Sequence, residues 1–335
     1  MVESTDFYFQ WHITNVCNNR CKHCYHEDYD KKNELSREQL LQIADHIEDA
    51  LEKWDFYSSA SITGGEPFTR KEDLFVLLRY LENHCERIAH YDILTNGILI
   101  TDKDISTLQT YKKLRRIQVS MEGPTPASHD AVRGDGDFLK VTNAIKKLKA
   151  NGFVVSVMTT LTKNNMELIP DLIQLLGELG VDYFALERFM PEGQGGSNAD
   201  WTLSKEETRR IFEYMTEQAL QVKVPHLLLY RTLYCLCSDD VTVGAMCSAG
   251  VSALTILPDA TILPCRRLPI PIGNVLGNGI IDTWYNSEIL WKLRDYNSYK
   301  GKCQECDHFL ECRGCRSMAY LATGDYMQED PQCWK

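Results

Sequence analysis

The thirteen cysteines of this chain are grouped in a way that constrains its fold. Three of them, Cys17, Cys21 and Cys24, stand in one short run near the start, and nine follow position 230. The N-terminus shows no basic region followed by an apolar run of signal length, so we expect a cytoplasmic protein. Because reducing compartments do not keep disulfides, metal or redox chemistry is the expected reason for so many cysteines.

Charge and composition exclude several classes of partner. The formal net charge is −11, whereas binding to nucleic acid depends on neutralising phosphates with basic side chains, so we expect no nucleic acid partner. No stretch reaches about 18 uninterrupted apolar residues, so no membrane span is expected either. The length of 335 residues predicts two domains, or one large barrel with an appended module.

The first cysteine group, in the run CNNRCKHC, has the spacing C-x3-C-x2-C. Three thiolates suit a 4Fe-4S cluster with one iron left open for a small molecule, whereas structural zinc requires four ligands. His12, His23 and His26 lie near enough in sequence to complete a zinc site. The spacing alone therefore leaves both metals open.

Segments of strand and helix character alternate between residues 8 and 187. This alternation is typical of parallel strands in βαβ units, and six repeats are fewer than the eight of a full barrel. The sequence thus predicts an α/β fold, a partial (β/α)6 TIM-like barrel. We expect strands at 8–14, 59–63, 91–95, 116–120, 153–160 and 182–187, and helices after a capping box at Ser36 and at 72–82, 104–110, 138–150 and 168–178.

Residues suited to chemistry follow the expected strands, where barrel enzymes gather their sites. The cysteine loop follows the first strand, and a glycine pair at such a point allows a ligand to approach the backbone closely. The later motifs are Thr63-Gly64-Gly65-Glu66-Pro67, Thr95-Asn96-Gly97, Ser120-Met121-Glu122-Gly123 and Glu187-Arg188.

Taken together and in this order, these motifs resemble the radical S-adenosylmethionine (SAM) superfamily over residues 7 to 190. The resemblance implies that Cys17, Cys21 and Cys24 are the catalytic ligands of a 4Fe-4S cluster whose open iron is chelated by SAM. It implies one-electron cleavage of SAM to methionine and a 5′-deoxyadenosyl radical, which takes hydrogen from the substrate. The implied cofactor-binding residues are Gly64, Gly65, Glu66, Ser120, Tyr25 and Arg133.

Two positions depart from the superfamily pattern. An aromatic residue usually precedes the third cysteine, whereas here His23 does and Tyr25 follows it. The acid after the fourth strand is commonly Asp, and here it is Glu122. The segment from His129 to Gly134, which contains Arg133, resembles one that is frequent in one branch of the superfamily.

The second cysteine group resembles the SPASM module, which carries auxiliary iron-sulfur clusters, although it has two rather than three residues between Cys312 and Cys315. The resemblance implies crossed ligation of two 4Fe-4S clusters. One would take Cys303, Cys306, Cys312 and Cys333, and the other Cys247, Cys265 and Cys315, with Cys237 or Cys235 as a fourth ligand or with one iron open.

A zinc knuckle formed by Cys303, Cys306, Cys312 and Cys315 is the alternative for this module, since zinc also accepts four thiolates. The upstream pair and Cys333 favour iron-sulfur clusters. Between the upstream cysteines, the run SALTILPDATILPC predicts a β-hairpin with a turn at Pro258-Asp259. The remaining Cys85, in a helical stretch, is predicted to be a packing residue.

These observations predict three regions: a radical SAM partial barrel at 1–200, a helical linker at 201–240 and a SPASM domain at 241–335. The glycine-rich segment 191–197 is open to two interpretations, a lid or an ordinary surface loop.

The predicted function is modification of a peptide or protein side chain by crosslinking, epimerisation or oxidation. The alternatives are processing of a small molecule such as a tetrapyrrole, and a zinc-stabilised binding module without catalysis. The expected partners are a peptide or protein substrate and an external electron donor of flavodoxin or ferredoxin type. Because only 16 residues precede Cys17, we expect leader recognition by the barrel, the C-terminal domain or a separate leader-peptide-binding protein.

Overall fold

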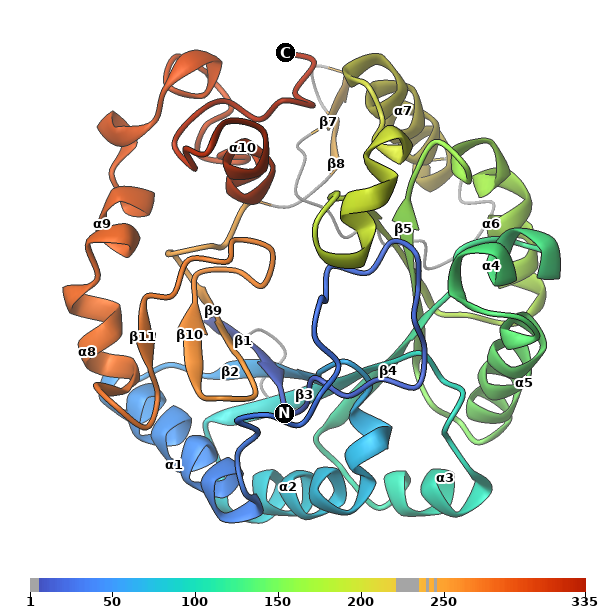
Figure 1. Ribbon diagram of the computed structural model, residues 1–335, viewed down its shortest axis with the longest axis vertical. Helices are drawn as coiled ribbons and strands as arrows, with labels where there is room; N and C mark the ends of the chain where they lie inside the picture. Colours follow the sequence, from blue (N-terminus) through green and yellow to red (C-terminus); the bar gives the residue numbers. More distant parts are fainter. Residues whose placement is uncertain (1–5, 221–234, 239–240, 244–245) are drawn as a thin grey trace. The chain divides into compact units, whose positions relative to one another are not determined.

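The computed structural model describes residues 6–220, 235–238, 241–243 and 246–335 (Figure 1). The chain forms two compact units, each assembled from segments that are far apart in the sequence. The first comprises Met1–Asn18, Asp28–Gln118 and Ser248–Asp295, and the second Asn19–Glu27, Val119–Cys247 and Tyr296–Lys335. The sequence boundaries near residues 200 and 240 stay a prediction.

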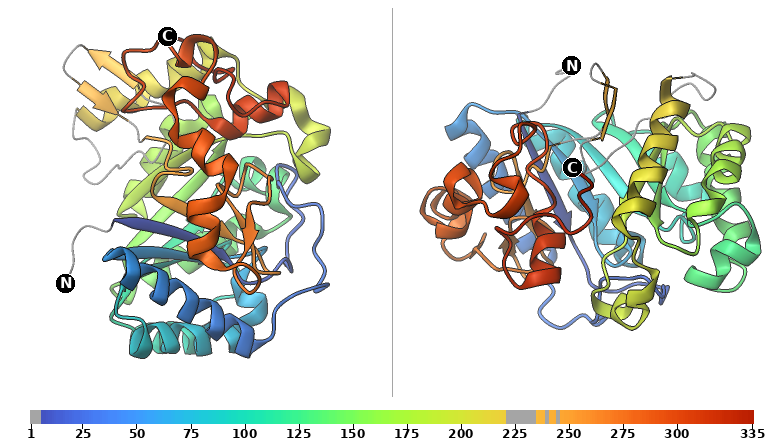
Figure 2. Two further views of the ribbon diagram at one scale, coloured as in Figure 1. Left: turned by 90° about the vertical axis from the view of Figure 1, so that its left-hand side faces the viewer. Right: turned by 90° about the horizontal axis from the view of Figure 1, so that it is seen from above.

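The first unit is built on parallel strands with helices α1 and α2 along their outer face (Figure 1 and Figure 2). The alternating residues Phe7, Phe9 and Trp11 of strand β1 are buried, as expected for the helix-facing side of a strand. The elements are β1 (Phe7–His12), α1 (Arg37–Trp54), β2 (Ser58–Thr63), η1 (Pro67–Arg70), α2 (Lys71–His84), β3 (Ile88–Thr95), α3 (Asp102–Leu108) and β4 (Leu114–Ser120).

A C-terminal hairpin extends this sheet. Strands β9 (Ala253–Ile256) and β10 (Thr261–Leu263) are antiparallel, which confirms the hairpin expected around Pro258. Strand β9 also pairs in parallel with β1, with Tyr8 opposite Ala253. The other edge of β10 pairs with β11 (Gly273–Asn274), and α8 (Gly279–Asn286) and α9 (Glu288–Arg294) follow.

The second unit contains the parallel pair β5–β6 and most of the remaining helices. None of the helices in the described ranges combines the length and apolar character needed to cross a membrane. The elements of the second unit are α4 (Pro126–Arg133), α5 (Asp137–Ala150), β5 (Val155–Leu161), η2 (Met166–Leu168), α6 (Ile169–Glu178), β6 (Tyr183–Arg188), η3 (Gly193–Trp201), α7 (Lys205–Leu220), β7 (Cys235–Ser238), β8 (Val241–Val243), η4 (Tyr296–Ser298), η5 (Gly301–Cys303) and α10 (Arg316–Thr323).

The strands and helices expected between residues 8 and 187 are found. The helical linker expected at 201–240 contains α7 but also strand β7, and its residues 221–234 and 239–240 lie outside the described part of the structure. The Ser36 capping box at the start of α1 is confirmed, since the Ser36 and Gln39 side chains each bond the other's backbone N–H. Helix α4 was not predicted; it begins after a capping box formed by Thr125 and Ser128. Within the segment 191–197, expected to be a lid or an ordinary surface loop, Gly193 begins the 3-10 helix η3, which ends at Trp201.

Candidate active site

Gly64 and Gly65 pack the loop after β2 against the segment that leads into Cys17. A Cβ atom on Gly64 would lie 2.5 Å from the Thr14 carbonyl oxygen, and one on Gly65 would lie 2.4 Å from that of Asn15. The Gly65 N–H donates to the Thr14 carbonyl at 2.7 Å. Only glycine permits this approach, so both residues fix the backbone just before the first cysteine.

Glu66 is completely buried, and its carboxylate is held by protein donors. One oxygen accepts hydrogen bonds from the Thr95 hydroxyl at 2.8 Å and the Phe68 N–H at 3.1 Å, and the other accepts from the Asn96 N–H at 2.7 Å. The carboxylate thus joins the loop after β2 to the loop after β3. This structural role was not predicted, and direct contact with SAM stays a prediction for Glu66.

The residues around Cys17 have further supports. The Thr14 hydroxyl and the Asn15 N–H both donate to Glu34, at 2.5 Å and 2.9 Å. The Asn96 amide donates to the Asn18 side chain at 2.8 Å. Cys17 is therefore carried on a segment that is fixed on both sides.

Cys21 and Cys24 belong to the second unit, in a loop that packs on the end of α4. The Lys22 N–H donates to the Val132 carbonyl at 2.9 Å. The Arg133 guanidinium donates to the Cys21 sulfur at 3.8 Å, and the His26 N–H donates to the Cys24 sulfur at 3.5 Å. Such N–H···S contacts stabilise negative charge on thiolates, as a cluster ligand requires.

Glu122 and Arg133 form a buried ion pair beside this loop. Arg133 donates twice to one Glu122 oxygen, at 2.9 Å and 2.5 Å, and His23 Nε2 lies 3.0 Å from the same oxygen. The other oxygen accepts from the Thr160 N–H at 2.9 Å. Burial alone would raise the pKa of Glu122, but His23 and Arg133 outweigh it and hold that pKa well below its usual value.

The structure gives Arg133 and His23 protein partners that were not predicted, and the cofactor contact predicted for Arg133 stays a prediction. Arg133, predicted as a cofactor contact, has Glu122 and Cys21 as its partners. His23 contacts Glu122. Ser120, at the end of β4, is half-buried, and its predicted SAM contact stays a prediction.

Helix η3 packs on the same cysteine loop. The Gly195 N–H donates to the Cys24 carbonyl at 2.9 Å, and the Gln194 N–H donates to the His26 carbonyl at 3.2 Å. The Asn198 amide donates to the Lys22 carbonyl at 2.8 Å. These bonds make η3 a support for the loop, with Tyr25 stacked on His26 at a centroid distance of 4.8 Å.

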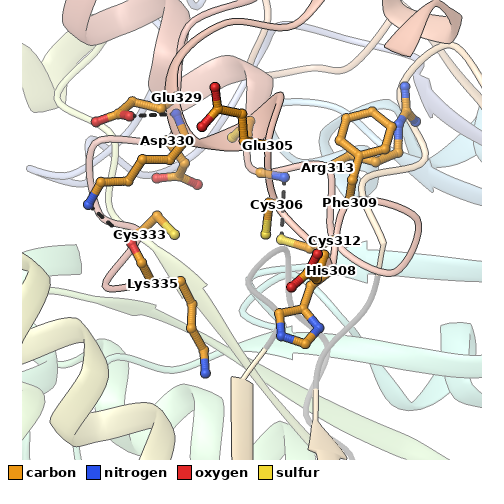
Figure 3. Close-up of a pocket in the computed structure, with 14 residues that line it drawn as sticks. Glu305, Cys306, His308, Phe309, Cys312, Arg313, Glu329, Asp330, Cys333 and Lys335 are labelled. Carbon is orange, nitrogen blue, oxygen red and sulfur yellow. Dashed lines mark hydrogen bonds between the residues drawn. The ribbon is translucent and has the colours of Figure 1, made fainter.

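Four cysteines of the C-terminal region line one cavity of about 450 Å³ (Figure 3). They are Cys303, Cys306, Cys312 and Cys333, the set expected for one auxiliary cluster. Cys315, which a zinc knuckle would require, does not line this cavity and packs against Met190 and Met318.

The donors around the cavity fit a cluster of several irons. Across the described residues, no three histidine, cysteine or carboxylate side chains converge closely enough to hold a single metal ion. A 4Fe-4S cluster instead takes its thiolates on separate irons. The Gly314 N–H donates to the Cys312 sulfur at 3.3 Å, and Arg316 donates to the Cys303 sulfur at 3.5 Å.

The second predicted set of auxiliary ligands is less fully described. Cys247 and Cys315 are buried in the second unit, whereas Cys265 belongs to the first. Cys235 and Cys237 contribute backbone to β7, and their side chains lie outside the described part of the structure. Ligation of one cluster by this set stays a prediction.

Two supporting residues were missed by sequence reasoning. Glu34 belongs to no motif, so nothing in the sequence could have linked it to Thr14. Arg316 follows Cys315 in the run CRGCR, where each of two cysteines precedes an arginine. That repeated Cys-Arg pair was the available signal for a cation beside the cluster.

The parallel α/β sheet and the two cysteine sites define a radical SAM enzyme. Residues 11–176 match the model of the radical SAM superfamily, and the chain belongs to that superfamily. Residues 247–307 match the SPASM model, described as an iron-sulfur cluster-binding domain, which places the chain in the SPASM branch. The cofactors predicted from the sequence, SAM and 4Fe-4S clusters, are those of this class.

Proteins of known function resemble the chain over nearly its whole length. It is 28% identical to the AdoMet-dependent heme synthase of Methanosarcina barkeri, over 96% of this chain and 95% of the relative. It is also 28% identical to the mycofactocin maturase MftC of Mycobacterium tuberculosis, over 96% of this chain and 81% of the relative.

A solved structure with a similar fold is Streptococcus suis SuiB bound to precursor peptide SuiA. Its TM-score is 0.77 at 19% identity, and the match covers 99% of this chain and 76% of SuiB. This likeness confirms the predicted fold class, a partial barrel followed by a SPASM domain.

Proposed function

We propose that this protein cleaves SAM reductively and modifies a side chain of a ribosomally made peptide or protein. The modification would be a crosslink, an epimerisation or an oxidation. The similarity to a maturase over 96% of this chain supports a peptide substrate. The observation that carries the proposal is the four-cysteine cavity, because it adds an auxiliary cluster site to the SAM-type cysteine loop.

In this proposal Cys17, Cys21 and Cys24 hold the catalytic cluster. When bound, that cluster supplies the electron that splits SAM into methionine and the radical that takes hydrogen from the substrate. The chain's own residues place the loop: Arg133 bonds to Cys21, and Gly64 and Gly65 bring the loop after β2 against the approach to Cys17. The proposed SAM contacts are Gly64, Gly65, Glu66, Ser120, Tyr25 and Arg133.

The auxiliary clusters complete the proposed site. Cys303, Cys306, Cys312 and Cys333 would hold one of them. Cys247, Cys265 and Cys315 would hold the other, with Cys237 as the preferred fourth ligand. The absence of Cys315 from the cavity lining counts against the zinc knuckle and against the non-catalytic alternative.

Iron and sulfide analysis of the anaerobically reconstituted protein tests the cluster assignment. About twelve irons per chain are expected for three 4Fe-4S clusters, and about eight for two. Zinc without sulfide would defeat the proposal. Changing Cys17, Cys21 and Cys24 to Ala should abolish 5′-deoxyadenosine formation while auxiliary iron remains, and Cys85→Ser is the control because Cys85 is buried in packing.

The remaining partners belong to the same proposal. A flavodoxin or ferredoxin type donor would supply the electron, and a separate protein could present a leader peptide. We also propose a cytoplasmic location, because the ligand thiols must stay reduced to bind iron.

A second candidate function is processing of a small molecule such as a tetrapyrrole. It is favoured by the similarity to a heme synthase over 96% of this chain. The two candidates separate when the reconstituted enzyme, SAM and a reductant are incubated with a short peptide encoded by a neighbouring gene or with a porphyrin. Mass spectrometry of the products shows which of the two is modified.

A further inference from the structure

We propose that Arg316 is a positioning residue that places a positive charge against the Cys303 sulfur of the auxiliary cluster at Cys303, Cys306, Cys312 and Cys333, and thereby favours the reduced form of that cluster. The inference rests on the proposed function, because it takes these four cysteines as cluster ligands.

Arg316 is held in one orientation. It is the first residue of α10 and is 1% exposed. One terminal nitrogen of its guanidinium donates to the Tyr326 and Gln328 carbonyls at 3.0 Å and 2.7 Å. The guanidinium carbon lies 4.9 Å from the centre of the Tyr299 ring. The other terminal nitrogen is thereby directed at the Cys303 sulfur, at 3.5 Å.

The charge of Arg316 lacks a carboxylate partner. Among the described residues its hydrogen bonds go to two carbonyl groups and the Cys303 sulfur, its guanidinium lies over the Tyr299 ring, and its Nε atom has no hydrogen-bond partner. The buried Arg133 and Arg188, in contrast, pair with Glu122 and Asp330. Because a buried cation needs an anion, the Cys303 thiolate is the group that can balance Arg316.

Gly314 keeps the approach to Cys303 open. Its φ is +60°, and a Cβ there would lie 2.4 Å from the Arg316 nitrogen and 3.2 Å from the Cys303 sulfur. Any other side chain would therefore push the guanidinium away from the thiol. The Gly314 N–H itself donates to Cys312, so two of the four thiols receive hydrogen bonds from this short segment.

A fixed cation and N–H···S bonds change the electron affinity of a cluster. Reduction adds one electron from the external donor to the cluster, with no bond formed or broken. The added negative charge is attracted to Arg316 in a buried site where solvent screens poorly. Hydrogen bonds and net charge at the sulfurs are among the factors that set cluster potentials. Arg316 is therefore expected to raise the potential.

The test compares Arg316→Gln with Arg316→Lys in a full-length chain with Cys17, Cys21 and Cys24 changed to Ala, so that only auxiliary clusters contribute. Midpoint potentials are measured by dithionite titration followed by electron paramagnetic resonance. Arg316→Gln should lower the midpoint potential of one auxiliary cluster by at least about 59 mV. For a one-electron couple, this shift means that the ratio of reduced to oxidised cluster at a fixed potential falls at least tenfold. Arg316→Lys keeps the charge and should shift the midpoint less.

Arg294→Gln is the matched control, because Arg294 also donates to two carbonyls and lies over a tryptophan ring without contacting a cysteine. Arg294→Gln should leave the midpoint potentials of both auxiliary clusters unchanged. Equal iron content with unmoved midpoints in Arg316→Gln would overturn the proposal. So would loss of the cluster from both Arg316 variants, since that outcome makes the residue structural. A parent protein without auxiliary iron and sulfide would instead defeat the proposed function.

Discussion

Arg188 and Asp330 form a two-pronged buried ion pair that joins the end of β6 to the C-terminal tail. Their nitrogen–oxygen distances are 3.0 Å and 2.9 Å. Asp330 also accepts the N–H of Cys315 at 2.8 Å. Burial would raise the pKa of Asp330, but Arg188 lowers it, so the carboxylate stays ionised. The pair therefore fixes the tail that carries Cys333.

Asp330→Asn should destabilise the protein by about 3–5 kcal/mol, because it leaves the Arg188 charge buried without its partner. Guanidinium denaturation measures this loss, and iron analysis should show less auxiliary iron. Glu213→Gln is the control, since the Glu213–Arg209 pair is exposed and is expected to contribute less than about 1 kcal/mol. Equal stability of the two variants would contradict the role given to Asp330.

Glu66→Gln should weaken SAM binding and also lower stability. In the variant, one carboxylate oxygen is replaced by an NH2 group, which is itself a donor. This NH2 group faces either the Asn96 N–H or the donors that bind the other oxygen, among them the Thr95 hydroxyl. At least one hydrogen bond is therefore lost, at about 1–3 kcal/mol. Calorimetric SAM binding and thermal unfolding measure the two effects separately. Glu72→Gln, at an exposed side chain, should change neither. Unaltered stability in Glu66→Gln would show that the bonds to Thr95 and Asn96 contribute nothing.

His129 makes stability depend on pH. Burial, with a contribution from Arg133, lowers its pKa from 6.5 to about 4, and its Nδ1 accepts the Glu122 N–H at 3.2 Å. The unfolded chain takes up the proton below pH 6.5 but the folded protein resists it until about pH 4. The free energy of unfolding should therefore decrease as the pH is lowered through this window, by about 2 kcal/mol from pH 7 to pH 5.

The measurement is urea denaturation at pH 7 and pH 5 for the parent and His129→Asn, whose side-chain oxygen can still accept the Glu122 N–H. The variant should lose less stability on acidification than the parent. His46→Asn, at an exposed histidine, should behave as the parent does. An identical pH dependence in His129→Asn would exclude His129 as the source.

Cys237→Ala should remove the fourth ligand of the auxiliary cluster proposed at Cys247, Cys265 and Cys315. The expected result is a changed spectrum for that cluster or loss of its iron, because each thiolate binds one corner. Cys235→Ala, two residues away, is the paired variant. If both variants keep their iron content and the spectrum of this cluster shifts when substrate is added, the result would instead favour an open iron that a substrate thiolate ligates.

The helices, strands and cysteine sites that could be predicted from the sequence are those encoded by residues close together in the chain. The capping box at Ser36 and the apolar stripe of α1 are encoded within a few residues, and the cysteine spacings lie in the sequence itself. Helix α4 was missed because it is only eight residues long and none of its apolar residues is buried, so it has no apolar stripe; only His129 is buried. The pairing of β9 with β1, and the bonds of Glu66 to the loop after β3, join residues far apart in the chain, so no local pattern reports them.

The pairing of Tyr8 with Ala253 has a consequence for synthesis on the ribosome. Strand β1 is among the first segments to emerge, yet one of its edges must wait for β9, which is made after most of the chain. During that interval an unpaired strand edge is exposed, and such edges recruit other chains. A truncation before residue 253 should therefore aggregate, even though it would contain the whole cysteine loop and all six strands that follow one another from β1 to β6.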